Sequence, residues 1–152
     1  MSTTQGKVNP LTATIRDVMQ PKVLTTTEAS QAKTAYELMR QRNIHHLPVI
    51  NDKGAVVGIV SDRDILRIAI LFKRKPKTTD DYLIDSSIKV SRVMTKNPFT
   101  VSPSDKPTEA VKLILNEHIS ALPVVDQGCI VGIVTIADLL RILNRLLGAS
   151  TN

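Results

Sequence analysis

Two short stretches of the sequence hold residue types that could bind a metal ion, transfer a proton or hold a ligand. They are the pair His45 and His46 and the tetrapeptide SDRD at 61–64. Neighbouring residues of an extended strand point to opposite faces, so His45 and His46 cannot both chelate one ion from a strand. The sequence contains no CxxC or HExxH motif and no Ser/His/Asp or Cys/His order typical of a nucleophile. We therefore expect no metal site, no catalytic residues and no enzymatic activity.

The tetrapeptide at 61–64 has a counterpart, TIAD at 135–138, and each follows an apolar run. A Ser or Thr followed three residues later by an acidic residue is a capping-box pattern for the start of a helix. Asp is shorter than the usual Glu or Gln, which makes Asp64 and Asp138 poorly suited to that role. A carboxylate at a helix start could also accept hydrogen bonds from both hydroxyls of a ribose, while free helix N–H groups face a phosphate. Capping and ligand binding do not exclude each other.

These motifs belong to an internal repeat. At a shift of 75 residues, VMQPKVLT at 18–25 aligns with VMTKNPFT at 93–100. NIHHLPVI at 43–50 aligns with HISALPVV at 118–125, and, at a shift of 74, VVGIVSDRDILRI at 56–68 aligns with IVGIVTIADLLRI at 130–142. Because both order and spacing are kept, the sequence indicates a tandem duplication.

Each copy predicts a helix, two strands and a closing helix. Ser30 and Asp105 occupy equivalent positions as expected helix N-caps, and Pro107 falls in the first helical turn. Turn residues at 51–54 and 126–128 separate short apolar runs, which predicts two hairpins. The closing helices are expected at 62–72 and 136–147.

Each copy is too small to bury its own sheet face well, so we expect the two copies to pack sheet against sheet. Gly58 and Gly132 lie inside expected strands and predict a close approach of another part of the backbone. No second glycine follows them at the spacing of a phosphate-binding loop.

The composition fits a globular protein with an anionic partner. Of 152 residues, 42% are hydrophobic and only 3% aromatic, so the core must be aliphatic. The net charge of +6 suits a nucleotide, a nucleic acid or an acidic protein. The single cysteine, Cys129, fits a reducing compartment. No apolar run reaches the ~20 residues of a membrane span, and the polar first residues do not resemble a signal peptide, so we expect a cytoplasmic location.

The repeated Val-Met, the Leu-Pro-Val strand and the Gly-Ile-Val-[Ser/Thr]-x-x-Asp ending resemble the CBS (cystathionine-β-synthase) domain. Two such copies in one chain resemble a CBS pair, also called a Bateman module. The resemblance implies an α/β fold in which two CBS repeats, related by pseudo-twofold symmetry, pack through their small β-sheets. We expect a flexible N-terminus at 1–12, the first repeat at 13–72, a linker at 73–87, the second repeat at 88–148 and a tail at 149–152.

The resemblance also implies two clefts that bind adenosyl compounds. AMP, ADP or ATP are the foremost candidates, with S-adenosylmethionine or NAD as further ones. Each cleft would combine the residues before the Leu-Pro-Val strand of one repeat with the [Ser/Thr]-x-x-Asp of the other, whose aspartate would bind ribose. Site A is expected to contain His45, His46, Thr135, Asp138, Val23, Leu24 and Thr25. Site B is expected to contain Ser120, Ala121, Ser61, Arg63, Asp64, Pro98, Phe99 and Thr100.

Two of these assignments concern side chains that can carry a positive charge. Arg63 is expected to favour a ligand phosphate at site B, because Ala137 replaces it in the second copy. The alternative for His45 and His46 is that they are only polar residues that end a loop before a core strand.

Three functions are compatible with the sequence. We favour a regulatory or energy-sensing module that binds an adenine nucleotide, performs no chemistry and acts on an unidentified protein. A nucleic-acid-binding protein could use the basic stretch KRKPK at 73–77, although no interleaved aromatic residues support base stacking there. A structural dimerisation module would bind no nucleotide. The apolar face of LLRILNRLLG at 139–148 is wide enough for both the core and a partner helix, which predicts a homodimer of CBS pairs.

Overall fold

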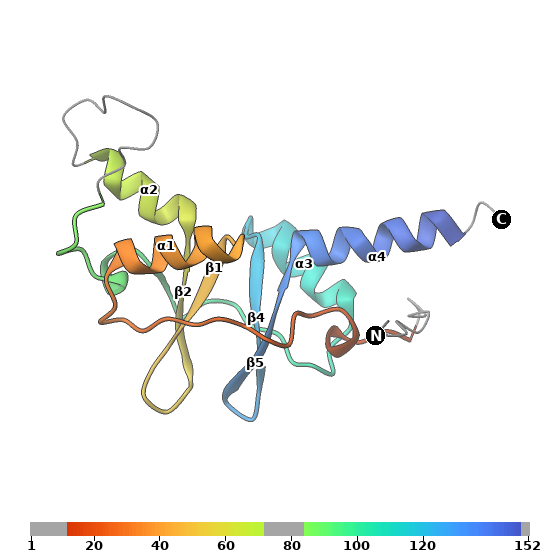
Figure 1. Ribbon diagram of the computed structural model, residues 1–152. Helices are drawn as coiled ribbons and strands as arrows, with labels where there is room; N and C mark the ends of the chain where they lie inside the picture. The colour runs from red at the N-terminus through yellow and green to blue at the C-terminus, as the bar shows by residue number, and fades with distance from the viewer. Residues whose placement is uncertain (1–11, 72–83, 150–152) are drawn as a thin grey trace, which may run out of the picture. The chain divides into compact units, whose positions relative to one another are not determined.

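The computed structural model describes residues 12–71 and 84–149. The basic stretch at 73–77 and most of the predicted linker, N-terminus and tail lie outside the described residues. Helices and small antiparallel sheets alternate along the chain, which confirms the mixed α/β class (Figure 1). The elements are η1 (Ile15–Asp17), α1 (Ala32–Arg42), β1 (His46–Ile50), β2 (Val56–Ser61), α2 (Asp62–Leu71), η2 (Val90–Arg92), β3 (Thr95–Lys96), α3 (Pro107–Glu117), β4 (Ala121–Asp126), β5 (Cys129–Thr135) and α4 (Ile136–Ala149).

The chain forms two compact units, and their boundaries differ from those of the sequence repeats. We call residues 23–98 the continuous unit and residues 1–22 with 99–152 the split unit. Each unit combines the hairpin of one repeat with the segment that begins the other repeat. The pseudo-twofold packing of the two repeats stays a prediction.

The continuous unit is built on the antiparallel hairpin of β1 and β2, with β3 as a third strand on the outer side of β2. Helices α1 and α2 contact each other and the hairpin (Figure 1). Their buried side chains form an aliphatic core with the strands, as the composition predicted. The fully buried members include Met39, Leu47, Val49 and Val60.

The split unit repeats this arrangement with α3, α4 and the hairpin of β4 and β5. In place of a third strand, Gln20 forms an isolated antiparallel bridge with Ile133. This bridge matches the pairing of Thr95 with Ile59 in the continuous unit, at equivalent repeat positions. The Val-Met segment of each repeat therefore pairs with the hairpin of the other repeat.

The predicted hairpins and their turns are confirmed. Gln127 and Gly128 both have positive φ angles of 48° and 82°, the backbone of a tight two-residue hairpin turn. The longer turn of the first hairpin places Gly54 at a φ of 77°. Asn43 and His118, which align in the repeat, both end a helix in the left-handed conformation.

The predicted N-caps at Ser30 and Asp105 are wrong by one residue. The N-cap residues are Gln31 and Lys106, and neither side chain caps its helix. Ser30 and Asp105 instead close the preceding turn, because each accepts a hydrogen bond from the backbone N–H three residues earlier. The first N–H of α1 is satisfied by the Ile88 carbonyl at 2.8 Å, and Pro107 begins α3 as predicted with no N–H to satisfy.

The close backbone approach predicted at Gly58 and Gly132 is confirmed. A Cβ atom added to Gly132 would lie 2.7 Å from Sδ of Met19 and 3.0 Å from the Gln20 carbonyl oxygen. At Gly58 the same atom would lie 2.6 Å from Sδ of Met94. The repeated methionine of the Val-Met motif thus packs on the strand glycine of the other repeat, which explains why both residues recur.

Candidate functional site

The SDRD tetrapeptide spans the junction between β2 and α2. Ser61 donates its backbone N–H and its hydroxyl to Oδ2 of Asp64, at 3.0 and 2.6 Å, and its Oγ accepts the backbone N–H of Asp64 at 3.1 Å. These reciprocal bonds are a capping box. The capping-box pattern read from the sequence is confirmed, although aspartate is shorter than the usual Glu or Gln and was expected to suit this role poorly.

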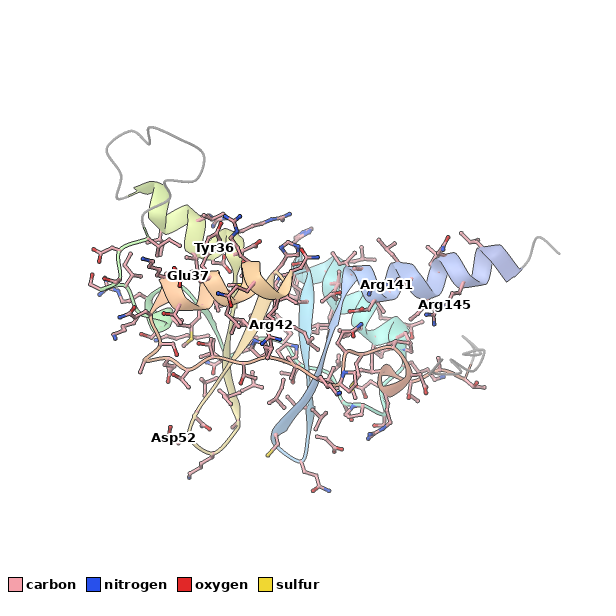
Figure 2. All side chains as sticks on the ribbon, in the orientation of Figure 1. Tyr36, Glu37, Arg42, Asp52, Arg141 and Arg145 are labelled. Carbon is pink, nitrogen blue, oxygen red and sulfur yellow. The ribbon has the colours of Figure 1, made fainter. Side chains whose placement is uncertain are left out.

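Thr135 and Asp138 form the same capping box at the junction of β5 and α4. The Thr135 hydroxyl donates to Oδ2 of Asp138 at 2.6 Å, and its backbone N–H donates to the same oxygen at 2.9 Å. Asp138 is only 4% exposed, and its other oxygen, Oδ1, accepts hydrogen bonds from Gln20 at 2.9 Å and Arg141 at 2.6 Å. Figure 2 shows Arg141 and Arg145 on α4. The sequence did not identify Gln20 or Arg141 as part of this site.

The residues that precede the Leu-Pro-Val strands lie beside these capping boxes within each unit. His46 is the pairing partner of Ser61, and Ala121 is the partner of Thr135. His45 also accepts the Asp62 N–H on its carbonyl oxygen, as Ser120 accepts that of Ile136. In each unit, the residues before the Leu-Pro-Val strand and the [Ser/Thr]-x-x-Asp motif therefore lie at the same end of the hairpin.

The corresponding ends of the two hairpins differ in the number of ionisable side chains. Nδ1 of His45 lies 2.7 Å from Oδ2 of Asp62, and the first repeat adds further ionisable side chains next to this pair. The second repeat keeps only the aspartate of its [Ser/Thr]-x-x-Asp motif. In order along the chain, His45, His46, Asp62, Arg63 and Asp64 correspond to Ser120, Ala121, Ile136, Ala137 and Asp138.

Residues 23–25 and 98–100, which belong to predicted sites A and B, each lead into a short bridge to the edge of a hairpin. In the continuous unit, Thr26 pairs in parallel with Val49 directly after Val23, Leu24 and Thr25. In the split unit, Val101 pairs in the same way with Val124, directly after Phe99 and Thr100. Leu24 is 36% exposed and Phe99 48% exposed, so both offer apolar surface. Sites A and B each join residues of both units and stay predictions.

His46 has a lowered pKa because burial of its side chain disfavours the charged imidazolium, an effect that the Asp62 carboxylate partly opposes. The unfolded chain, with a histidine pKa of about 6.5, then binds more protons than the folded chain. Stability contributed by His46 is therefore complete above about pH 6.5 and is lost as the pH falls through the folded-state pKa.

We accordingly expect the melting temperature to fall between about pH 7.5 and about pH 5.5, and the fall to be smaller in His46→Ala, which carries the residue of the second repeat. Thermal unfolding at both pH values measures this difference. His118→Asn, which installs the residue of the first repeat at an exposed helix end, is the control and should retain the wild-type fall. An identical fall in His46→Ala and the wild type would contradict the prediction.

No group of three or more His, Cys, Asp or Glu side chains within residues 12–71 and 84–149 is arranged to hold a metal ion. In the same ranges, no helix has the length and apolarity needed to cross a membrane.

Comparison with known proteins identifies the family. The family model of the CBS domain matches this chain twice, at residues 15–70 and 90–145. The chain belongs to the CBS-domain family. A CBS domain-containing protein of Dictyostelium discoideum is 33% identical over 135 residues, which cover 88% of this chain and 92% of that protein. The tandem CBS organisation predicted from the sequence is confirmed.

Two further relatives differ in what surrounds or occupies the CBS pair. The solved structure of CBSX2 in complex with AMP is 29% identical, with a TM-score of 0.73, and the match covers 88% of this chain and 98% of that one. Homoserine O-acetyltransferase of Methanococcoides burtonii is 34% identical over 88% of this chain, but the match spans only 24% of the enzyme. CBS pairs thus occur both as nearly whole proteins and as a minor part of an enzyme.

Proposed function

We propose that this CBS pair is a regulatory module that binds an adenine nucleotide, AMP, ADP or ATP, and performs no chemistry itself. The observation that carries the proposal is the likeness to CBSX2, which was solved with AMP and matches 88% of this chain. The local chemistry supports it, since each unit places a carboxylate, a hydroxyl and a helix start at one end of a hairpin. S-adenosylmethionine and NAD are further candidate ligands, and a cytoplasmic location fits the single, exposed Cys129.

Ribose recognition is assigned to the two capping-box aspartates. An ionised carboxylate accepts hydrogen bonds from two adjacent hydroxyl groups, and such charge-assisted bonds are stronger than neutral ones. At Asp64, Oδ2 already accepts two bonds from Ser61, while Oδ1 accepts none from the described residues. The N-terminus of α2 and the exposed Arg63 beside it would favour the phosphate groups of the same ligand.

The remaining assignments follow the predicted sites. At site A, His45 and His46 would line the cleft with Thr135 and Asp138, and residues 23–25 would form its apolar wall. At site B, Ser120 and Ala121 would lie with Ser61, Arg63 and Asp64, and residues 98–100 would form the wall. Such a module would signal if the protein has two conformations and the nucleotide binds one of them more tightly. Binding would then increase the population of that conformation.

Asp64→Asn tests ribose binding, because asparagine keeps the shape but removes the charge. We expect AMP affinity at this site to fall at least about tenfold, as hydrogen bonds to a charged group contribute about 1.5–3 kcal/mol. Isothermal titration calorimetry with AMP, ADP, ATP, S-adenosylmethionine and NADH measures the change and identifies the preferred ligand.

Asp52→Asn is the matched control. Asp52 is exposed in the turn at the opposite end of the same hairpin and is labelled in Figure 2, so the substitution removes the same charge far from the site. Its AMP affinity should equal that of the wild type. If no compound of the panel binds the wild-type protein, the proposed function is wrong and the structural dimerisation module is favoured instead.

We also propose that the protein is a homodimer formed through α3 and α4. Six large apolar side chains of these helices are exposed, and such clusters on a protein surface often mark an interface with another protein. On α4 they follow spacings of four, three and four residues, the seam of a packed helix pair. The six residues are Val111, Leu115, Ile136, Leu140, Leu143 and Leu147.

Helix α1 of the first repeat does not carry the exposed apolar pair of α3. The positions of Val111 and Leu115 are taken by Tyr36, which is half-buried, and Arg40, which is exposed. Because a second copy of the chain presents the same α3 and α4 face, an isologous contact would cover the exposed leucines of both copies.

A further inference from the structure

The two ribose-binding aspartates occupy equivalent positions, yet their carboxylates are engaged differently. From this difference we propose that the side chain of Gln20 is an intramolecular competitor for the nucleotide at Asp138, so that the two aspartates bind ribose with unequal affinity and Asp64 binds first. The inference deepens the proposed function and rests on it.

At Asp138 both carboxylate oxygens already accept hydrogen bonds. Oδ2 accepts the backbone N–H and the hydroxyl of Thr135, as Oδ2 of Asp64 does from Ser61. Oδ1 takes Nε2 of Gln20 at 2.9 Å and a guanidinium nitrogen of Arg141 at 2.6 Å. A ribose hydroxyl would donate the same kind of bond to the same oxygen, so it must displace a donor that belongs to the protein.

At Asp64 the second oxygen has no such occupant. Oδ2 accepts the two bonds of the capping box, and Oδ1 accepts none from the described residues. The equivalent of Gln20 is Thr95 and the equivalent of Arg141 is Arg67, and neither forms a hydrogen bond or ion pair with Asp64. A ribose hydroxyl can therefore bond Oδ1 of Asp64 without displacing a described side chain.

The backbone holds Gln20 and Thr95 in the same place relative to their hairpins. Gln20 exchanges two backbone hydrogen bonds with Ile133, at 2.8 and 3.1 Å, and Thr95 pairs with Ile59 at the matching position. The methionine before each of them packs on the strand glycine in both units. Since the anchoring is shared, side-chain length decides the difference: the glutamine amide reaches the aspartate, while the shorter threonine does not.

Gln20 is better placed than Arg141 to act as the competitor. The Arg141 side chain is 63% exposed and reaches Asp138 from within the same helix, so it can turn into solvent and pair with a ligand phosphate instead. Gln20 is held by its backbone hydrogen bonds to β5. Its amide is uncharged, so a phosphate attracts it no more than water does and does not compensate for the lost bond to Asp138. Displacing it costs binding energy at every nucleotide, whatever the phosphate number.

A reciprocal exchange of the two residues tests the inference, with AMP titrated into the full-length protein by calorimetry. Wild-type protein should show two binding steps that differ at least about fivefold in affinity, a difference that the displacement of one hydrogen bond is sufficient to produce. Asp64→Asn should weaken the tighter step and Asp138→Asn the weaker one, which assigns each step to its aspartate.

Gln20→Thr should then tighten the weaker step about fivefold or more, while Thr95→Gln should weaken the tighter step. Gln41→Thr, the same change at an exposed position of α1, is the control and should leave both steps unchanged. Two equal steps in the wild type, or a weaker step that Gln20→Thr leaves unchanged, would overturn the inference alone. Absence of AMP binding in the wild type and in Gln20→Thr would overturn the proposed function and the inference together.

Discussion

Replacing Gly132 by valine is expected to lower the free energy of unfolding by about 1–3 kcal/mol or more, the cost of overpacking a filled interior. The first carbon of the new side chain would lie 2.7 Å from Sδ of Met19 and 3.0 Å from the Gln20 carbonyl oxygen. Met19 is flexible and can move, but the carbonyl belongs to the backbone pair that joins Gln20 to β5. The substitution therefore forces the segment that begins the first repeat away from the hairpin of the second. Urea denaturation followed by circular dichroism measures the loss.

Gly148→Ala is the control for this substitution. Gly148 lies in α4, and an added Cβ would meet nothing within 4 Å, so its stability should be unchanged or slightly raised, since alanine favours a helix. An unfolding midpoint of Gly132→Val equal to that of the wild type would show that the segment containing Met19 and Gln20 does not pack on β5.

Converting Leu140 and Leu147 together to glutamate is expected to dissociate the proposed dimer. Both leucines lie on the exposed apolar face of α4, at 56% and 63% exposure, seven residues apart. A carboxylate buried in an apolar contact without a partner loses its hydration, and an isologous dimer would bury four new charges. Since each 1.4 kcal/mol is a tenfold change, we expect the dissociation constant to rise about 100-fold or more. Sedimentation velocity over a range of protein concentrations measures the change.

A matched control uses Thr34→Glu with Gln41→Glu. These residues are also exposed and seven apart, but they lie on α1 of the first repeat. The control protein should sediment like the wild type. Both double variants should keep the wild-type helix content, because all four substituted positions are exposed. A wild-type protein that sediments as a monomer at all concentrations would refute the proposed dimer.

The hairpins and the closing helices were predicted from residues that lie close together in the sequence. The tight turn at 126–128 requires positive φ angles, and Gly128 adopts one at no steric cost. The hairpins follow from such turns between short apolar runs, and the closing helices begin where SDRD and TIAD place a capping box. These features depend on residues a few positions apart, so their causes are visible in the sequence.

The misplaced helix caps show where local reasoning fails. Ser30 is a suitable N-cap by type, yet α1 begins two residues later because the Ile88 carbonyl, from a distant segment, satisfies the N–H of Ala32. At Asp64 the capping-box pattern held although the aspartate side chain is shorter than the Glu or Gln usual at this position. In both cases backbone geometry, and not residue preference, decided the hydrogen bond.

The duplication, the two hairpins, the closing helices and the family were determined by the sequence alone, because repeated motifs and turn residues act over short distances. Only the tertiary structure revealed that each Val-Met segment pairs with the hairpin of the other repeat. A single pair of bridging residues leaves no periodic pattern in the sequence. The methionine that packs beside each pair contacts a glycine far away in the sequence. The bond between Gln20 and Asp138 joins residues 118 positions apart, and its absence at Thr95 and Asp64 distinguishes two sites that the aligned repeats had made equivalent.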